Sequence, residues 1–480
     1  MKRHPLLCLV LALLSPHAPA AVHTVSAGQS ILAAVKQSAP GDTVRVMPGT
    51  YVETVYIDRD NITLQGVMVG GERPVLDGRN TLKDGILVAG DGVTVEHFLI
   101  RNYTANGLNL QGVNNFVVRH NIVQDTGIYA INPELSRNGL VAYNRISGVW
   151  DAAIYCGECM DVDILYNEAF GSVMGIESQT SQNVLIEGNY VHDNATGIAA
   201  FLIPGVSRKT TGNTVIRNNF VVHNNRANFA PPDSMPGLVP EGVGIAIAGY
   251  DEVTLEGNQI NGNQSAGILL VDQATAFGSN FALDPAQDPT VNSARIYSNM
   301  LFGNGGEPLG LVAAYLADSG LPRGPDILDA DPTSAGNCIY SKEAWFAVGV
   351  DHWSLCAQPT ATAVASMRLA APIAPRTWSD DQLGRNTWVA VCSACHNENG
   401  YLIGPPVARI QQDFVGAPEA LAAWIAAPTR MNADFPPMPP QDYLPEKTRL
   451  AVARHVLGLQ PKAAANTPPT AGYNVDESGN

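Results

Sequence analysis

The chain has 480 residues, of which 15% are charged and 45% hydrophobic, and its formal net charge is −16. This length predicts two or three domains with ample hydrophobic core. The excess of acidic side chains argues against a nucleic-acid partner, because phosphate binding depends on clustered lysine and arginine. Low charge density with 45 glycines and 33 prolines also argues against a helical bundle or a coiled coil. A turn-rich, mainly β protein is the class that remains.

The first twenty residues have the pattern of a secretory signal. Lys2 and Arg3 precede an apolar run over residues 5–14, and Ala18-Pro19-Ala20 provides small residues for cleavage. We therefore expect a signal peptide over 1–20, cut after Ala20, and a periplasmic or secreted protein. No later stretch has the roughly 18 consecutive apolar residues of a membrane span, so we expect no transmembrane segment.

Residues 90–305 contain a repeated unit, in which a short apolar strand, an asparagine and further apolar residues precede a turn. The aligned asparagines follow one another at steps of 23, 23, 22, 30, 39 and 41 residues and are Asn121, Asn144, Asn167, Asn189, Asn219, Asn258 and Asn299. A period near 22 is typical of a solenoid, and the longer steps predict loops inserted into some turns. At an inward corner, each asparagine amide is expected to bond to the backbone and to neighbouring asparagines. The sequence predicts a mainly β fold, a right-handed parallel β-helix over 21–320, with a capping helix at 29–37.

Three segments carry a family resemblance. They read GDTVRVMPGTYVE (41–53), GIAAFLIPG (197–205) and NNRANFAPP (224–232). The chain resembles the secreted parallel β-helix repeat proteins related to the pectate-lyase-like superfamily over roughly residues 24–320. This resemblance implies the fold and fixes no chemistry.

The strongest chemical signal is the sequence VCSACH at 391–396, which contains Cys392, Cys395 and His396. Two thiols at this spacing form thioethers to the vinyl groups of one haem, and the histidine that follows reaches the iron. Residues 378–392 are predicted to form a helix that begins at Ser379 or Asp380 and ends at the cysteines. Further helices are predicted at 418–427 and 445–459. We expect one covalently bound haem c.

Residues 376–460 resemble the class I c-type cytochromes, so we expect a small all-α domain over 376–461 and a disordered tail over 462–480. The resemblance makes His396 the proximal iron ligand, oriented by the carbonyl group of Pro405. It makes Met438, in FPPMPPQDYL (435–444), the sixth ligand, with Met431 as the competing choice. Because both axial positions would be occupied, the haem is expected to transfer electrons rather than to bind substrate.

The other cysteines have different spacings. Cys156 and Cys159 form C-x-x-C without a following histidine, and the favoured interpretation is a disulfide that braces a turn. A redox-active dithiol is the alternative. Cys338 and Cys356 are expected to form a disulfide within a cap or linker over 321–375.

The outer face of the β-helix carries weak catalytic candidates. Tyr129, Tyr155 and Glu177 occupy equivalent positions in successive turns, and strand alternation directs them outward. They are expected to form an acidic and aromatic groove that fits a sugar chain, although an ordinary solvated face is the favoured interpretation. Polysaccharide lyases and epimerases of this fold use a basic residue and Ca²⁺, and nothing in the sequence supports a Ca²⁺ site or a lysine and arginine cluster.

Three functional hypotheses remain. The favoured one is an exported electron-transfer protein with a periplasmic redox partner protein, whose β-helix binds a partner, a small molecule or a polysaccharide. The second is an oxidoreductase in which the haem accepts electrons from a substrate on the β-helix. The third is a polysaccharide lyase or epimerase with an appended electron-transfer domain. We expect electron transfer rather than carbohydrate chemistry.

Overall fold

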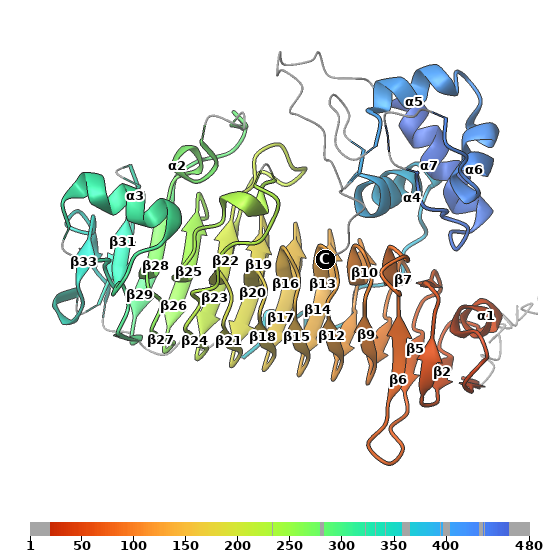
Figure 1. The fold of residues 1–480 in the computed structure, drawn as a ribbon, viewed down its shortest axis with the longest axis horizontal. Helices are drawn as coiled ribbons and strands as arrows, with labels where there is room; N and C mark the ends of the chain where they lie inside the picture. Colours follow the sequence, from red (N-terminus) through yellow and green to blue (C-terminus); the bar gives the residue numbers. More distant parts are fainter. Residues whose placement is uncertain are drawn as a thin grey trace, which may run out of the picture.

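The main body of the computed structural model is a long parallel β-helix, as predicted (Figure 1). The structure describes residues 20–459 except 233, 279–282, 322, 332, 341, 358–364, 394, 397–403, 432–434 and 436. The predicted signal peptide, apart from its last residue, and the predicted tail over 462–480 lie outside this range. Within it, successive turns of the chain add strands to three parallel sheets of 13, 11 and 10 strands.

The strands are named below by sheet, in their spatial order. The 13-stranded sheet contains β1 (Val22–Val25), β2 (Thr43–Val46), β5 (Thr63–Gly66), β8 (Thr94–Glu96), β11 (Val117–Arg119), β14 (Arg137–Ala142), β17 (Met160–Leu165), β20 (Gln182–Glu187), β23 (Gly212–Arg217), β26 (Val253–Glu256), β29 (Arg295–Tyr297), β32 (Cys338–Ile339) and β34 (Ser354–Leu355). The 11-stranded sheet contains β33 (Ala347–Val348), β31 (Ile327–Asp329), β28 (Ala266–Val271), β25 (Val243–Ala248), β22 (Thr196–Phe201), β19 (Met174–Gln179), β16 (Ala152–Gly157), β13 (Tyr129–Glu134), β10 (Asn106–Gln111), β7 (Asp84–Val88) and β4 (Val55–Ile57). The 10-stranded sheet contains β3 (Gly49–Tyr51), β6 (Pro74–Asp77), β9 (Leu99–Arg101), β12 (Ile122–Gln124), β15 (Arg145–Ser147), β18 (Glu168–Phe170), β21 (Tyr190–His192), β24 (Phe220–Val222), β27 (Gln259–Asn261) and β30 (Met300–Phe302).

Apolar side chains in register fill the interior. One inward column of fully buried isoleucines runs from β13 to β28 and consists of Ile131, Ile154, Ile176, Ile198, Ile245 and Ile268. Burying each such side chain contributes roughly 1.5–3 kcal/mol. Gly197 precedes Ile198, and a Cβ atom there would lie 2.5 Å from the carbonyl oxygen of Gly244 in the next turn. This close approach explains why a small residue precedes the isoleucine in these turns.

The predicted asparagine ladder lies at the corner between the 13-stranded and 10-stranded sheets. Asn167 is typical of it. Its Oδ1 accepts from the backbone N–H of Asn144 at 2.9 Å, and its Nδ2 donates to the carbonyl of Val141 and to Oδ1 of Asn189, both at 3.0 Å. The ladder satisfies buried backbone groups that no strand can pair, so this prediction is confirmed. A second ladder, which was not predicted, lies at the next corner and consists of Asn194, Asn224, Asn263 and Asn304.

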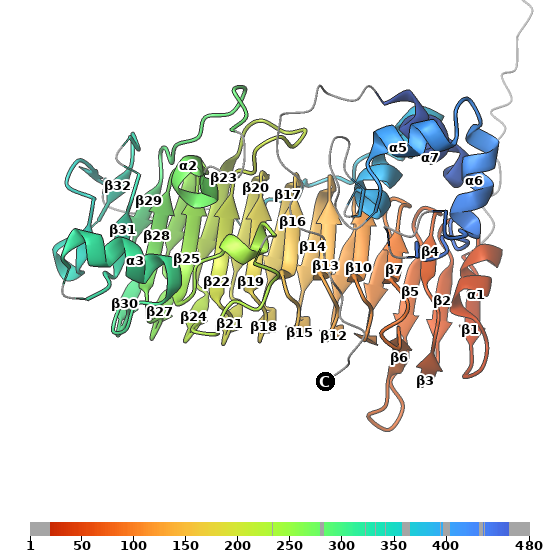
Figure 2. The ribbon, with the colours of Figure 1, turned by 45° about the horizontal axis from the view of Figure 1, so that its top comes forward.

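The predicted loop insertions lie where the asparagine steps lengthen. Residues 202–211 separate β22 from β23, and residues 223–242, with the short helix η1 (Pro236–Leu238), separate β24 from β25. Two helices, α2 (Gln273–Phe277) and α3 (Gly310–Ser319), belong to later insertions. Figures 1 and 2 show these segments on the side of the β-helix where the 11-stranded sheet lies. At the other end, α1 (Ile31–Gln37) packs on β1, β2 and β4, at the place predicted for the cap.

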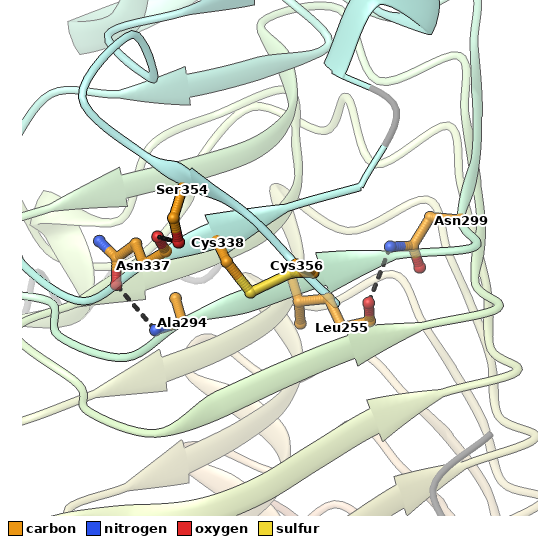
Figure 3. The surroundings of a disulfide bond; sticks show 7 residues. All are labelled: Leu255, Ala294, Asn299, Asn337, Cys338, Ser354 and Cys356. Carbon is orange, nitrogen blue, oxygen red and sulfur yellow. Dashed lines mark hydrogen bonds between the residues drawn. A yellow bond between two sulfur atoms is a disulfide. The ribbon is translucent and has the colours of Figure 1, made fainter. Parts of the chain in front are cut away.

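The β-helix extends beyond the predicted end at residue 320. The short strands β31 to β34 and the helical turn η3 (Lys342–Ala344) add further turns as far as Leu355. Cys338 and Cys356 form a disulfide between the last two strands of the 13-stranded sheet (Figure 3). The disulfide therefore lies within the last turns and not in a separate connector.

Residues 365–376, which were predicted to be a linker, form an ordered strap on the β-helix. The backbone N–H groups of Met367, Leu369 and Ile373 donate to side chains of successively earlier turns, namely Asp163, Asn138 and Asn115. At the end of the strap, the guanidinium group of Arg376 contacts both carboxylate oxygens of buried Asp91, at 2.8 and 3.1 Å. The strap runs back along the β-helix and returns the chain towards its N-terminal turns.

The C-terminal segment is helical. It contains α4 (Asp380–Thr387), the π-helical turn η4 (Trp388–Cys392), α5 (Val407–Asp413), α6 (Pro418–Ala426) and α7 (Glu446–Gly458). The positions agree with the predicted helices, except that α5 was not predicted. Ser379 caps α4 in a capping box with Gln382. Both views show these helices beside β4, β7 and β10 (Figures 1 and 2). Over the part of the chain that the structure describes, no helix is long and apolar enough to cross a membrane.

Candidate functional site

The predicted haem-binding residues border one open cavity in the helical segment. Cys392 ends η4, Cys395 and His396 follow it, and Gly404, Pro405 and Met438 complete this part of the wall. Both cysteines are free thiols. Most of the remaining wall is apolar and comes from Trp388, Leu421, Trp424, Ile425, Val452 and Val456.

The imidazole ring of His396 is fixed by its neighbours. Its Nδ1 lies 2.8 Å from the carbonyl oxygen of Pro405. A Cβ atom at residue 404 would lie 2.4 Å from Cε1 of the ring, so Gly404 leaves the space that the ring occupies. Burial lowers the pKa of His396, which favours the neutral, metal-binding form. An Nδ1–H group that donates to Pro405 leaves Nε2 as the free nitrogen.

Two methionines line the same cavity, in agreement with the two candidates for the sixth ligand. Met438 is partly buried and packs against the apolar cluster around Trp388 and Val456. Met431 is 54% exposed. The packing therefore favours Met438.

These residues fit a haem c group. The two free thiols could form thioethers, and a neutral imidazole and a thioether sulfur border the same space, whose other walls are largely apolar.

The helical segment is anchored to β7 and β10. Asn109 Nδ2 donates to the carbonyl of Ala390 at 2.9 Å, and Lys83 Nζ donates to the carbonyl of Val391 at 2.5 Å. Tyr56 and Leu87 of the β-helix pack with Val391, Tyr443 and Leu444 in one buried cluster. The two parts of the chain therefore share an interface in addition to the strap.

A second open cavity lies on the outer face of the 11-stranded sheet. Its floor comes from β13 to β31, and the insertions with η1, α2 and α3 form its other walls. Most of its lining is apolar. Tyr129, Asp151, Tyr155, Glu177 and Gln179 form one polar part of the lining.

The structure brings the three weak catalytic candidates together at this cavity. Tyr129 and Tyr155 stack with ring centroids 4.3 Å apart, and Tyr155 pairs in register with Glu177. The prediction of equivalent positions is wrong for Tyr129, because the register that pairs Ile131 with Ile154 places Tyr129 three residues before the position opposite Tyr155. Tyr155 and Glu177 are buried, so the expectation of an ordinary solvated face is wrong. The insertions shield this face from solvent, and their shape could not be derived from the repeat.

The carboxyl groups here are unusually hard to ionise. Burial raises the pKa of Asp151 to about 8. Burial also raises the pKa of Glu177, and repulsion by Asp151 and Glu134 raises that pKa further. Burial and the nearby Glu158 raise the pKa of Glu134 to about 8. Strand alternation in the sequence could have identified Glu134 and Gln179 as further residues of this outer face. Glu134 pairs with Gly157 from the turn before, and Gln179 pairs with Gly157 from the turn after.

The predicted disulfide between Cys156 and Cys159 is absent, because both are free buried thiols. Cys159 lies at the third corner of the β-helix, where its Sγ lies 3.3 Å from the carbonyl oxygen of Pro133. Ser136, one turn earlier, makes the matching bond to Leu110, and Ser181 receives the N–H of Cys159. The thiol therefore takes the place of a serine in a corner ladder. Burial raises the pKa of Cys159, which disfavours the reactive thiolate.

Comparisons with known proteins found one family and several solved structures that are similar to this chain. The family described as periplasmic copper-binding protein (NosD) matches residues 37–235. No curated protein shows significant similarity to the chain. Similar solved structures include the A-module of an Azotobacter vinelandii mannuronan C-5 epimerase, with 16% identity over 66% of this chain and 84% of that chain and a TM-score of 0.44. An alginate lyase from Paenibacillus has 14% identity, covers 59% of this chain and 97% of its own chain, and has a TM-score of 0.44. These identities are too low to transfer an activity.

Among the described residues, no group of three or more histidine, cysteine, aspartate or glutamate side chains is arranged to hold a metal ion.

Proposed function

We propose that this protein is an exported c-type cytochrome that carries one covalently bound haem and transfers electrons. The observation that supports the proposal best is the shared cavity of Cys392, Cys395, His396 and Met438. Three residues of the motif at 391–396 and a methionine 42 positions after His396 could together supply the attachment and ligand chemistry of one haem c. Their apolar surroundings are suited to a buried cofactor.

In this proposal, Cys392 and Cys395 would hold the haem through thioethers, and His396 and Met438 would bind its iron. The bound haem would accept and release one electron at its iron. Pro405 orients the imidazole through Nδ1. Trp388, Leu421 and Val456 would give the haem an apolar environment, and the thioether sulfur of Met438 would favour a higher potential than a second histidine.

Export supports the same function. The sequence begins with a signal-like segment, and the family that matches residues 37–235 is described as periplasmic. Haem c with two protein ligands has no open position for substrate, so the partner would be a redox protein of the same compartment. The net charge of −16 favours a partner with a basic or neutral docking surface.

Absorption spectra of the full chain, produced in the periplasm of a host that matures c-type cytochromes, test this proposal. We expect a sharp c-type band in the reduced form and a methionine-ligated ferric spectrum. Met438→Ala should abolish the methionine signature, whereas Met431→Ala, from the same cavity, should keep it. A folded protein without the c-type band would overturn the proposal.

The second candidate function is carbohydrate chemistry at the β-helix, as a lyase or epimerase. It is favoured by Asp151 and Glu177, because buried carboxyl groups with a raised pKa are suited to general acid and base work. The similar solved structures named above are a mannuronan C-5 epimerase and an alginate lyase. The described lining of the cavity contains no lysine or arginine to neutralise a uronate. Ultraviolet absorbance of unsaturated products from alginate and pectin tests the lyase reaction.

The third candidate, a haem-coupled oxidoreductase, is favoured by the position of the two cavities along one sheet. Asn109, which contacts the helical segment, is in register with Asn132, one turn before Tyr155. Successive strands lie about 4.8 Å apart, so Asn109 and Tyr155 are about 10 Å apart along the sheet. Reduction of the ferric haem by a candidate substrate would support this function, and Asp151→Asn should slow that reduction.

A further inference from the structure

The cavity on the 11-stranded sheet combines a large apolar wall with a small acidic end. The apolar part comes from Met174, Phe201, Leu269, Phe277, Val312 and Leu328. An apolar molecule, or the apolar body of a larger one, would gain free energy by leaving water for this space. The acidic end then determines which polar group that molecule must carry.

Asp151 provides the polar contact that lacks a partner. Its side chain lines the cavity, the residue is 5% exposed, and Oδ1 has no hydrogen-bond partner among the described residues. A buried carboxylate oxygen without a partner costs free energy unless a ligand or a proton satisfies it. Oδ1 of Asp151 therefore marks the place where a ligand would donate a hydrogen bond.

The charge at this end favours a cation. Asp151 and Glu177 are the ionisable acids of the lining, Glu134 lies close enough to repel Glu177, and the described lining contains no lysine, arginine or histidine. An anionic ligand would add to this repulsion, and a neutral ligand would leave it unchanged. A cation removes it.

We propose that this cavity binds an organic cation, an amine whose ammonium group meets Asp151 and Glu177 and whose apolar body lies against the cavity wall. Tyr129 and Tyr155 border the ammonium position, and Gln179 accepts from the Tyr155 hydroxyl at 3.0 Å, which holds that ring in place. The site does not depend on a haem, so the cytochrome proposal and this one can fail separately.

Binding of an ammonium group should strengthen as the pH rises from 6 to 8.5. Burial raises the pKa of Asp151 to about 8, so the free site holds protons that the cation must displace. The other titratable groups that face this position are Tyr129 and Glu134 on β13, Tyr155 on β16, Glu177 on β19 and Tyr315 on α3. Burial also raises the pKa of the two stacked tyrosines, so they stay neutral throughout this range.

Titration calorimetry with three probes of one shape tests the proposal. 2-Phenylethylamine, 2-phenylethanol and phenylacetate share an aromatic body and differ in charge. At pH 8.5 we expect the amine to bind the full chain at least tenfold more tightly than the alcohol, and phenylacetate to give no heat. Equal or tighter binding of the alcohol or the anion would overturn the proposal. Absence of amine binding at millimolar concentration to the folded protein would overturn it as well.

Matched variants locate the site. Asp151→Asn and Glu177→Gln should each weaken amine binding tenfold or more and leave binding of 2-phenylethanol unchanged. Glu307→Gln, an exposed carboxyl outside the cavity, should bind like the wild type. Both cavity variants keep the shape of the side chain and remove only its capacity for charge, so near-ultraviolet circular dichroism should report a native fold. Unchanged amine affinity in both folded variants would contradict the assignment.

Discussion

The side chain of Asn109 in β10 donates to the backbone carbonyl of Ala390 at 2.9 Å, two residues before Cys392. Residues that are 281 positions apart in the chain thus meet at the start of the predicted haem attachment site. Together with Lys83 and the apolar cluster of Tyr56 and Leu87, this bond fixes the helical segment on the first turns of the β-helix. The cavity that contains Cys392 and the cavity on the outer face of the 11-stranded sheet consequently lie along the same sheet.

Arg376→Gln should loosen the strap that leads to the helical segment. The change leaves Asp91 buried without its bidentate partner, and a lost charge-assisted pair of this kind costs about 1–3 kcal/mol in the free energy of unfolding. Denaturant unfolding should show this loss, and limited proteolysis should cut the strap faster than in the wild type. Arg385→Gln, on an exposed position of α4, is the control and should change neither result. Wild-type stability in Arg376→Gln would show that the strap contributes nothing.

The repeat pattern predicted most of the β-helix, because asparagines that bond to one another in adjacent turns recur along the sequence. It missed the ladder through Asn194, because insertions separate its members by 30 to 41 residues. It also ended the β-helix too early, because the last strands are only two or three residues long. The strap contacts at Asn115 and Asp163 join residues more than 200 positions apart, which no local pattern reveals.

The corner thiol gives a test of the third ladder. Cys159→Ser should leave the free energy of unfolding within about 0.5 kcal/mol of the wild type, because a hydroxyl makes the same bonds at Ser136 and Ser181. Cys159→Ala loses the bond to Pro133 and should cost about 1 kcal/mol more. Alkylation followed by mass spectrometry should find two thiols at 156 and 159 only after unfolding. A disulfide-linked peptide in unreduced protein would contradict the structure.

The β-helix should become less stable as the pH rises, because Asp151 in the cavity on the 11-stranded sheet is buried. Burial raises the pKa of Asp151 from 3.8 to about 8, so between these values the folded protein binds a proton that the unfolded chain releases. The contribution of this group to the free energy of unfolding therefore falls as the pH rises from about 4 to 8. Asp151→Asn removes this dependence and should stabilise the protein at pH 9 by more than about 1 kcal/mol. Denaturant unfolding at pH 5 and pH 9 measures it, and a larger pH dependence in the variant would contradict the account.

Gly404→Ala should displace the proximal imidazole. The new Cβ atom would lie 2.4 Å from Cε1 and 2.8 Å from Nδ1 of His396, so the ring must move from its bond to Pro405. In the haem-loaded protein we expect covalent attachment to persist, the potential to shift and the axial-ligand spectrum to change. Gly458→Ala is the control, because nothing lies within 4 Å of the Cβ atom there. Identical spectra for both variants would argue against His396 as the ligand.

The central claim is that Cys392 and Cys395 carry one haem. Intact mass spectrometry of the full chain after acid-acetone extraction measures this directly, since only a thioether-linked haem survives the treatment. We predict the mass of the processed chain plus one haem, retained in Cys156→Ser/Cys159→Ser and lost in Cys392→Ala/Cys395→Ala. Folded wild-type protein with the mass of the bare chain, or with a disulfide between Cys392 and Cys395, would contradict it.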